Sequence, residues 1–157
     1  TAELREQRRG LIVMHWPDAD RAGHATEWMS DAYAAATREL DEALGRVLAY
    51  LDLEDPGTLL VALADHGGGG RVTNHHDSAH PLDRTIPIML AGGGIRGGQI
   101  YGSSDSIAAH PKDNPVHARD FVATIYDALG YDQSTTVVDV TGRQHHVVPE
   151  SPVTALF

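Results

Sequence analysis

Carboxylate and imidazole side chains gather in three short segments of this chain. In chain order they are Asp18, Asp20 and His24, then Asp65 and His66, then His75, His76, Asp77, His80 and Asp83. A single exposed Asp or His is most often a solvated loop residue. Such a concentration of both types, in a chain with 10 histidines among 157 residues, exceeds what a solubilising surface requires. The three segments therefore predict a metal site in preference to a polar edge without metal.

The spacing of these residues suits shared ions. Asp20 and His24 stand four residues apart, which on a helical turn places their Cβ atoms about 6 Å from each other. Asp65 and His66 are adjacent at the end of an apolar run, where successive side chains diverge, so they could serve a second ion or bridge two. Mixed carboxylate and imidazole ligation favours zinc, with manganese or iron as alternatives, over magnesium and calcium.

Three apolar runs precede these segments and are predicted to be strands: Leu11–Trp16, Thr58–Ala64 and Ile86–Ala91. Near-continuous apolar runs of this length are typical of strands buried on both faces of a parallel sheet. Ligands of open α/β sheets sit beyond the carboxyl ends of the strands. We therefore expect the three runs to be neighbouring parallel strands whose ends bring Asp20, Asp65 and the loop from His75 to His80 together.

Helices are predicted between and after these strands. From Met29 to Leu51 apolar residues recur every three or four positions, and Ser30 could cap the start. The turn Asp55–Gly57 ends that unit. A shorter helix is predicted over Asp120–Leu129 with Gly130 as its stop, followed by a possible strand at His146–Val148. The order indicates an α/β fold with a mostly parallel sheet flanked by helices, in one domain spanning residues 1–157.

Composition excludes several function classes. A net charge of -10 without a basic patch argues against a nucleic-acid backbone or an anionic membrane as a partner. The absence of cysteine excludes disulfides, thiolate zinc sites and thiol catalysis. Nothing resembles a signal peptide, and the run Leu11–Met14 falls far short of the roughly 20 residues of a membrane span. We expect a soluble chain of unknown compartment. Because it starts at Thr1 without Met, we also expect a truncated piece.

Other motifs in the sequence give weaker indications of function. Gly92–Gly97 fits G-x-G-x-x-G, but no helix is expected to open there, so we interpret these glycines as a tight turn. A catalytic triad has candidate serines but no G-x-S-x-G elbow. The histidines expected at the surface are His110, His117, His145 and His146. Trp28 is expected to pack in the core, close enough to the first segment to touch a substrate.

The motifs, taken in order, carry a family resemblance. The sequence DRAGH, then ADHG, then a histidine-containing loop leading to an apolar strand and the turn AGGGI resembles the second half of alkaline-phosphatase-superfamily enzymes. The part from residue 11 to ADHG is most similar to type I phosphodiesterase/nucleotide pyrophosphatases. The stretches from residues 86 to 105 and 120 to 132, and the GRQ segment, resemble sulfatase-like members. The resemblance implies an alkaline-phosphatase-like fold of which this chain is the C-terminal part.

The resemblance also implies ligand roles. Asp20, His24 and one later histidine would hold one metal, and Asp65 with His66 would help to hold the second. The later histidine falls best on His76, with His75 and His80 as alternatives. Asp18 does not match the motif and would support a ligand or be solvated.

One departure from the family pattern limits the expected activity. Family members carry an earlier metal-binding Asp and a Ser or Thr nucleophile, and Thr1–Gly10 offers no counterpart to either. We therefore predict a two-metal hydrolase of small-molecule phosphate esters whose nucleophile-bearing part is absent, and expect this chain alone to be a poor enzyme. The alternatives are a non-catalytic metal-binding fragment and a sulfatase-like ester hydrolase. Self-association, or association with the missing N-terminal half, is also expected.

Overall fold

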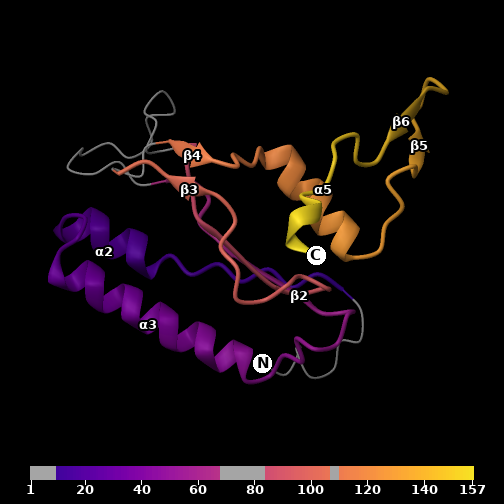
Figure 1. The fold of residues 1–157 in the computed structure, drawn as a ribbon. Coiled ribbons are helices and arrows are strands. Elements are labelled where there is room, and N and C mark those ends of the chain that lie inside the picture. The colour runs from indigo at the N-terminus through magenta and orange to yellow at the C-terminus, as the bar shows by residue number, and fades with distance from the viewer. Residues whose placement is uncertain (1–9, 68–83, 107–109) are drawn as a thin grey trace. The chain divides into compact units, whose positions relative to one another are not determined.

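A computed structural model describes residues 10–67, 84–106 and 110–157 of the chain (Figure 1). Its contacts divide the chain into two compact units, with the boundary between Asp52 and Leu53. Each unit is described by itself.

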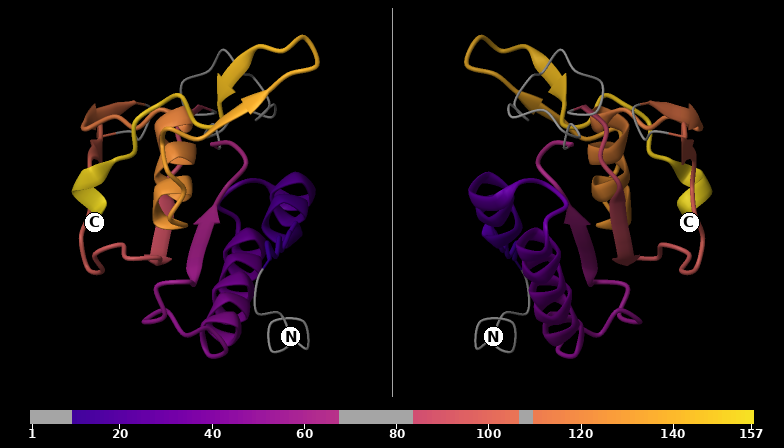
Figure 2. Two further views of the ribbon diagram at one scale, coloured as in Figure 1. Left: turned by 90° about the vertical axis from the view of Figure 1, so that its right-hand side faces the viewer. Right: turned by 90° about the vertical axis from the view of Figure 1, so that its left-hand side faces the viewer.

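The described part of the first unit, residues 10–52, contains two helices that pack side by side, α2 (Asp18–Thr26) and α3 (Asp31–Leu48) (Figures 1 and 2). Helix α3 confirms the predicted amphipathic helix. The Ser30 hydroxyl accepts a hydrogen bond from the Tyr33 N–H at 3.2 Å, which confirms the predicted cap. Helix α2 carries acidic residues in its first turn and His24 in its last, an arrangement that complements the helix dipole.

The connection between α2 and α3 is strained. Glu27 has φ 89° and ψ 149°, a region that is essentially restricted to glycine, and Met29 has φ 67°. Hydroxyl groups tie the two ends of the connection together, because the Thr26 Oγ1 and Ser30 Oγ atoms lie 2.8 Å apart. The Thr26 hydroxyl donates to the carbonyl of Ala22, so the Ser30 hydroxyl is the donor between the two.

The predicted strand Leu11–Trp16 is not formed. This segment has no strand pairing and is largely exposed, with Leu11 at 87% and Val13 at 79% of full exposure. A strand requires a hydrogen-bonding neighbour, and the described part of the first unit contains helices but no other strand. The apolar composition of the segment therefore did not suffice to make it a strand.

The second unit begins with a two-stranded sheet of β1 (Leu59–Leu63) and β2 (Ile88–Gly92). Both strands were predicted, but their expected parallel arrangement is wrong. They are antiparallel, with Leu59 opposite Gly92 and Leu63 opposite Ile88. An apolar run reads alike in both directions, and a long connection permits either orientation. The sequence pattern therefore identifies these strands without fixing their direction.

Two tight turns flank this sheet. Before β1, the Asp55 carboxylate accepts the Gly57 N–H at 2.9 Å, and the Asp55 carbonyl accepts the Thr58 N–H at 3.0 Å, as the turn prediction requires. At the end of β2, Gly92, Gly93 and Gly94 all have positive φ, and a Cβ at Gly92 would overlap the Thr58 carbonyl. This confirms the interpretation of the glycines as a turn, and no helix opens at Gly97.

The described residues after β2 form further short elements. They are β3 (Ser103–Ser104), β4 (Pro111–Asp113), α5 (Ala118–Ala128), β5 (Thr136–Val138), β6 (Gln144–His146) and the 3-10 helix η1 (Thr154–Leu156). Strands β3 and β4 pair, as do β5 and β6, and both pairings are antiparallel. Helix α5 confirms the predicted helix, and Gly130 follows it with φ 77°. Strand β6 overlaps the expected strand only at His146.

The core of the second unit forms on one face of α5. Ala123 and Thr124 are fully buried there. The Thr124 hydroxyl donates to the Asp120 carbonyl at 2.7 Å and accepts the Val153 N–H at 2.9 Å. It thereby joins the helix to the C-terminal segment.

Among the described residues, no helix is long and apolar enough to cross a membrane.

The strained connection yields a stability prediction. Replacing Glu27 by glycine relieves a conformation that costs about 1–3 kcal/mol in other residues, partly offset by the extra freedom of the unfolded chain. We expect Glu27→Gly to raise the free energy of unfolding by about 1 kcal/mol in urea denaturation. The matched control is Glu27→Ala, which removes the side chain but keeps the Cβ and the strain. A glycine variant less stable than the alanine variant would contradict the assignment.

Candidate metal-binding residues

The closest match to a metal site is the pair Asp20 and His24 on α2. The helix places them one turn apart, with the Asp20 Oδ1 and His24 Nε2 atoms separated by 3.5 Å and both side chains about half exposed. This separation is long for a hydrogen bond. A tetrahedral zinc ion with ligand distances of about 2.0–2.2 Å sets its oxygen and nitrogen ligands about 3.4 Å apart. The pair therefore fits two corners of one such site.

Aromatic rings extend from His24 across the strained connection. The His24 and Trp28 ring centroids lie 5.8 Å apart at an interplanar angle of 63°, and those of Trp28 and Tyr33 lie 5.5 Å apart at 71°. We call His24, Trp28 and Tyr33 the aromatic row. Both contacts have the edge-to-face geometry that aromatic quadrupoles favour.

The second pair, Asp65 and His66, follows β1. The Asp65 Oδ1 atom accepts the His66 N–H at 3.1 Å, and the Asp65 Oδ2 atom lies 3.8 Å from His66 Nε2. His66 Nδ1 lies 2.7 Å from the carbonyl oxygen of Gly67. Since a carbonyl only accepts, Nδ1 carries the proton, and in the neutral ring the lone pair resides on Nε2. Metal-binding histidines are commonly oriented by such a carbonyl.

Of the remaining predicted ligands, the structure describes only Asp18. Asp18 is exposed in the first turn of α2. His75, His76 and His80 lie outside the described residues. Within residues 10–67, 84–106 and 110–157, no group of three or more potential ligands gathers around one point. Asp20 and Asp65 belong to different units, so their meeting at one site stays a prediction.

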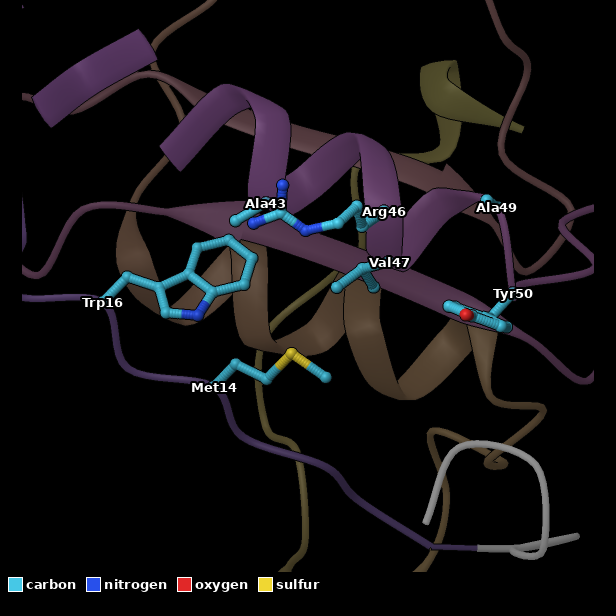
Figure 3. Close-up of a pocket in the computed structure, with 7 residues that line it drawn as sticks. All are labelled: Met14, Trp16, Ala43, Arg46, Val47, Ala49 and Tyr50. Carbon is cyan, nitrogen blue, oxygen red and sulfur yellow. The ribbon is translucent and has the colours of Figure 1, made fainter. Parts of the chain in front are cut away.

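An open groove of about 380 Å³ lies in the first unit, between the segment before α2 and the end of α3 (Figure 3). Its lining residues are Met14, Trp16, Ala43, Arg46, Val47, Ala49 and Tyr50. The lining is mostly apolar and contains none of the predicted ligands. The groove therefore offers no carboxylate or imidazole side chain to a metal ion.

A third carboxylate–histidine pair was missed by the sequence analysis, which treated His145 only as a surface residue. The Asp139 Oδ1 atom accepts bonds from the Thr141 N–H and hydroxyl and from the Arg143 N–H. The Asp139 Oδ2 atom accepts Arg143 Nε at 3.1 Å and His145 Nε2 at 2.9 Å. The Thr141 hydroxyl, followed by His145, holds the pKa of Asp139 well below its ordinary value. The signal in the sequence was Asp139 two residues before Thr141-Gly142, which is typical of a turn.

This Asp139 clasp, formed with Thr141, Arg143 and His145, differs chemically from the α2 pair. Both of its carboxylate oxygens already accept several hydrogen bonds, and the Arg143 guanidinium would repel a cation. It therefore serves to close the β5–β6 hairpin.

The four histidines expected at the surface, His110, His117, His145 and His146, are all exposed.

Comparison with known proteins gives two family matches. The model described as "Metalloenzyme superfamily" matches residues 1–112, and the model described as "Protein of unknown function (DUF1501)" matches residues 73–157. Each match covers more than half of the chain. No curated protein and no solved structure was found to match it.

The Asp139 clasp predicts a pH dependence. Because folding lowers the pKa of Asp139, the carboxylate stabilises the hairpin fully above its unfolded pKa of about 3.9, and the stabilisation is lost as pH falls through the folded value. We expect the Thr141 and Arg143 amide signals in NMR spectra to show loss of the hairpin only below about pH 3.9. In Asp139→Asn this acid transition should be absent. An identical transition in both proteins would refute the role of Asp139.

Proposed function

This chain belongs to the metalloenzyme superfamily and, over residues 73–157, to the family described as DUF1501, and on this basis we propose that it supplies metal ligands to a phosphate ester hydrolase. Superfamily membership indicates an enzyme that depends on metal. The finer proposal is a hydrolase resembling the phosphodiesterases and nucleotide pyrophosphatases, with two metal ions in the complete site.

The observation that carries the proposal is the 3.5 Å separation of Asp20 Oδ1 and His24 Nε2, which suits two ligands of one ion. We assign the third ligand to His76, with His75 and His80 as alternatives. Catalytic zinc sites commonly have three protein ligands and one open position. Zinc is therefore the proposed ion, and manganese or iron could bind the same donor set.

We assign Asp65 and His66 to the second ion. The Gly67 carbonyl holds His66 in the tautomer whose Nε2 can bind metal, so this ring needs no proton shift on binding. Asp65 is strongly exposed, with 91% of its side chain accessible, and its carboxylate can turn toward a ligand. When bound, the metals would supply Lewis acidity that stabilises charge on the transferring group and activates the attacking oxygen.

The charge of the chain supports this assignment. A protein of net charge -10 repels an anionic phosphate ester unless cations stand between them. Asp20 and Asp65 each bring negative charge to a proposed cation site, and the bound ions reverse the local sign. The substrate is therefore expected to bind through metal. The similarity of the part beginning at Ile86 to sulfatase-like proteins makes a sulfate ester the second candidate substrate, because it offers the same kind of anionic oxygens.

The metal assignment is tested by substitution of His24. We expect His24→Ala to weaken zinc binding at least about tenfold, since it removes one of three ligands. Elemental analysis after dialysis and calorimetric titration measure the binding. The matched control is His145→Ala, because His145 also contacts a carboxylate, at 2.9 Å, and has a similar side-chain exposure of 53% against 51%. Absence of bound metal in the unaltered chain, or equal affinity in both variants, would overturn the assignment.

The substrate class is tested by hydrolysis of chromogenic esters. We expect slow, metal-dependent cleavage of a phosphodiester, because the predicted nucleophile-bearing part is absent from this chain. That cleavage should be lost on chelation and in His24→Ala, because the metal supplies the charge stabilisation. A sulfate ester assayed in parallel distinguishes the two candidate substrates. Cleavage of neither ester by a zinc-loaded chain would leave a metal-binding protein without this activity.

A further inference from the structure

We propose that Trp28 is a positioning residue that holds the His24 imidazole in the orientation needed for metal binding. The inference rests on the proposed metal site and deepens it. It assigns a role in ligation to a residue that carries no metal-binding atom.

The first support is the contact itself. Asp20 and Trp28 approach the His24 ring, the carboxylate at 3.5 Å from Nε2 and the indole with its centroid at 5.8 Å in an edge-to-face arrangement. His24 is half exposed, and an exposed side chain ordinarily samples several rotamers. A ring on one side restricts that sampling, so the imidazole is already directed toward Asp20 before an ion binds. Such preorganisation increases affinity by reducing the ordering that binding requires.

The second support is the way in which Trp28 is itself held. Gly23 is buried in α2, and a Cβ at this position would overlap the six-membered ring of Trp28. On another side the indole contacts Tyr33 with ring centroids 5.5 Å apart. Tyr33 stands in the first turn of α3, where its backbone N–H donates to the capping Ser30 hydroxyl. The glycine thus admits the indole against α2, and α3 keeps it there.

The third support is the strained backbone on both sides of Trp28. Glu27 at φ 89° and Met29 at φ 67° adopt conformations that few residues other than glycine accept. Strain of this kind persists only where the surrounding contacts determine it, and it gathers at functional sites. The backbone strain at Glu27 and Met29 therefore accompanies the placement of the Trp28 indole against His24.

Two variants test the role while leaving both proposed ligands of α2 unchanged. Trp28→Leu keeps an apolar side chain but removes the ring, and Gly23→Ala displaces the indole without altering any ring of the aromatic row. We expect each to weaken zinc binding by about three- to tenfold in calorimetric titration, because the imidazole regains its rotameric freedom. Trp28→Phe should retain most of the zinc affinity of the unaltered chain, since phenylalanine keeps an aromatic edge against His24. Urea denaturation of each variant shows that binding is measured on folded protein.

A spectroscopic readout examines the contact directly. The chain contains two tryptophans, so Trp16→Phe leaves Trp28 as the sole indole fluorophore. In that background we expect zinc to change the emission of Trp28 and bound cobalt to quench it strongly. The further change His24→Ala should abolish both effects. This measurement remains valid even if Trp28→Leu fails to fold.

The outcomes separate the two proposals. If the unaltered chain binds no zinc, the proposed function fails and this inference fails with it. If the chain binds zinc, while Gly23→Ala or a folded Trp28→Leu binds it equally well, the metal site stands and the positioning role is overturned. Weaker binding in both variants, with rescue by phenylalanine and a metal-dependent Trp28 signal, supports the role.

Discussion

The geometry of one helical turn underlies the proposed chemistry of this chain. A spacing of four residues on α2 brings the Asp20 carboxylate and the His24 imidazole to 3.5 Å, close to the separation of two ligands on a tetrahedral ion. That geometry requires α2 to be helical and its last turn to be anchored. Packing against α3, with Trp28 inserted over Gly23, supplies the anchor. The connection between α2 and α3 therefore determines both how the two helices pack and how the proposed ligands on α2 are positioned.

Sequence patterns predicted the features that depend on neighbouring residues. Helix α3 could be predicted because apolar residues recur with the helical period and Ser30 can cap its first turn. The end of α5 could be predicted because Gly130 adopts a positive φ readily. The proximity of Asp20 and His24 followed from their spacing. In each case the interaction that determines the feature joins residues only a few positions apart, so the local sequence is sufficient to predict it.

Features set by distant partners could not be predicted in the same way. The orientation of β2 against β1 depends on the connection between the two strands. The apolar pattern of the strands does not indicate that orientation. Leu11–Trp16 has strand-like composition but lacks a strand neighbour among the described residues of its unit. The Asp139 clasp was overlooked because β5 and β6 have three residues each, too few to show periodicity. The distance between the pair Asp20 and His24 and the pair Asp65 and His66 likewise depends on contacts between residues far apart in the sequence.

The Asp139 clasp has a consequence for the order of folding. All of its partners lie within six residues of the carboxylate, so closing this loop costs little chain entropy. Hairpins of this size form in about 1–10 μs, without waiting for distant parts of the chain. The bond from Thr124 to Val153, by contrast, joins residues 29 apart and must await the docking of the C-terminal segment on α5. The hairpin between them would then shorten the chain that remains to be ordered, so that a local turn lowers the entropic barrier to closing the core.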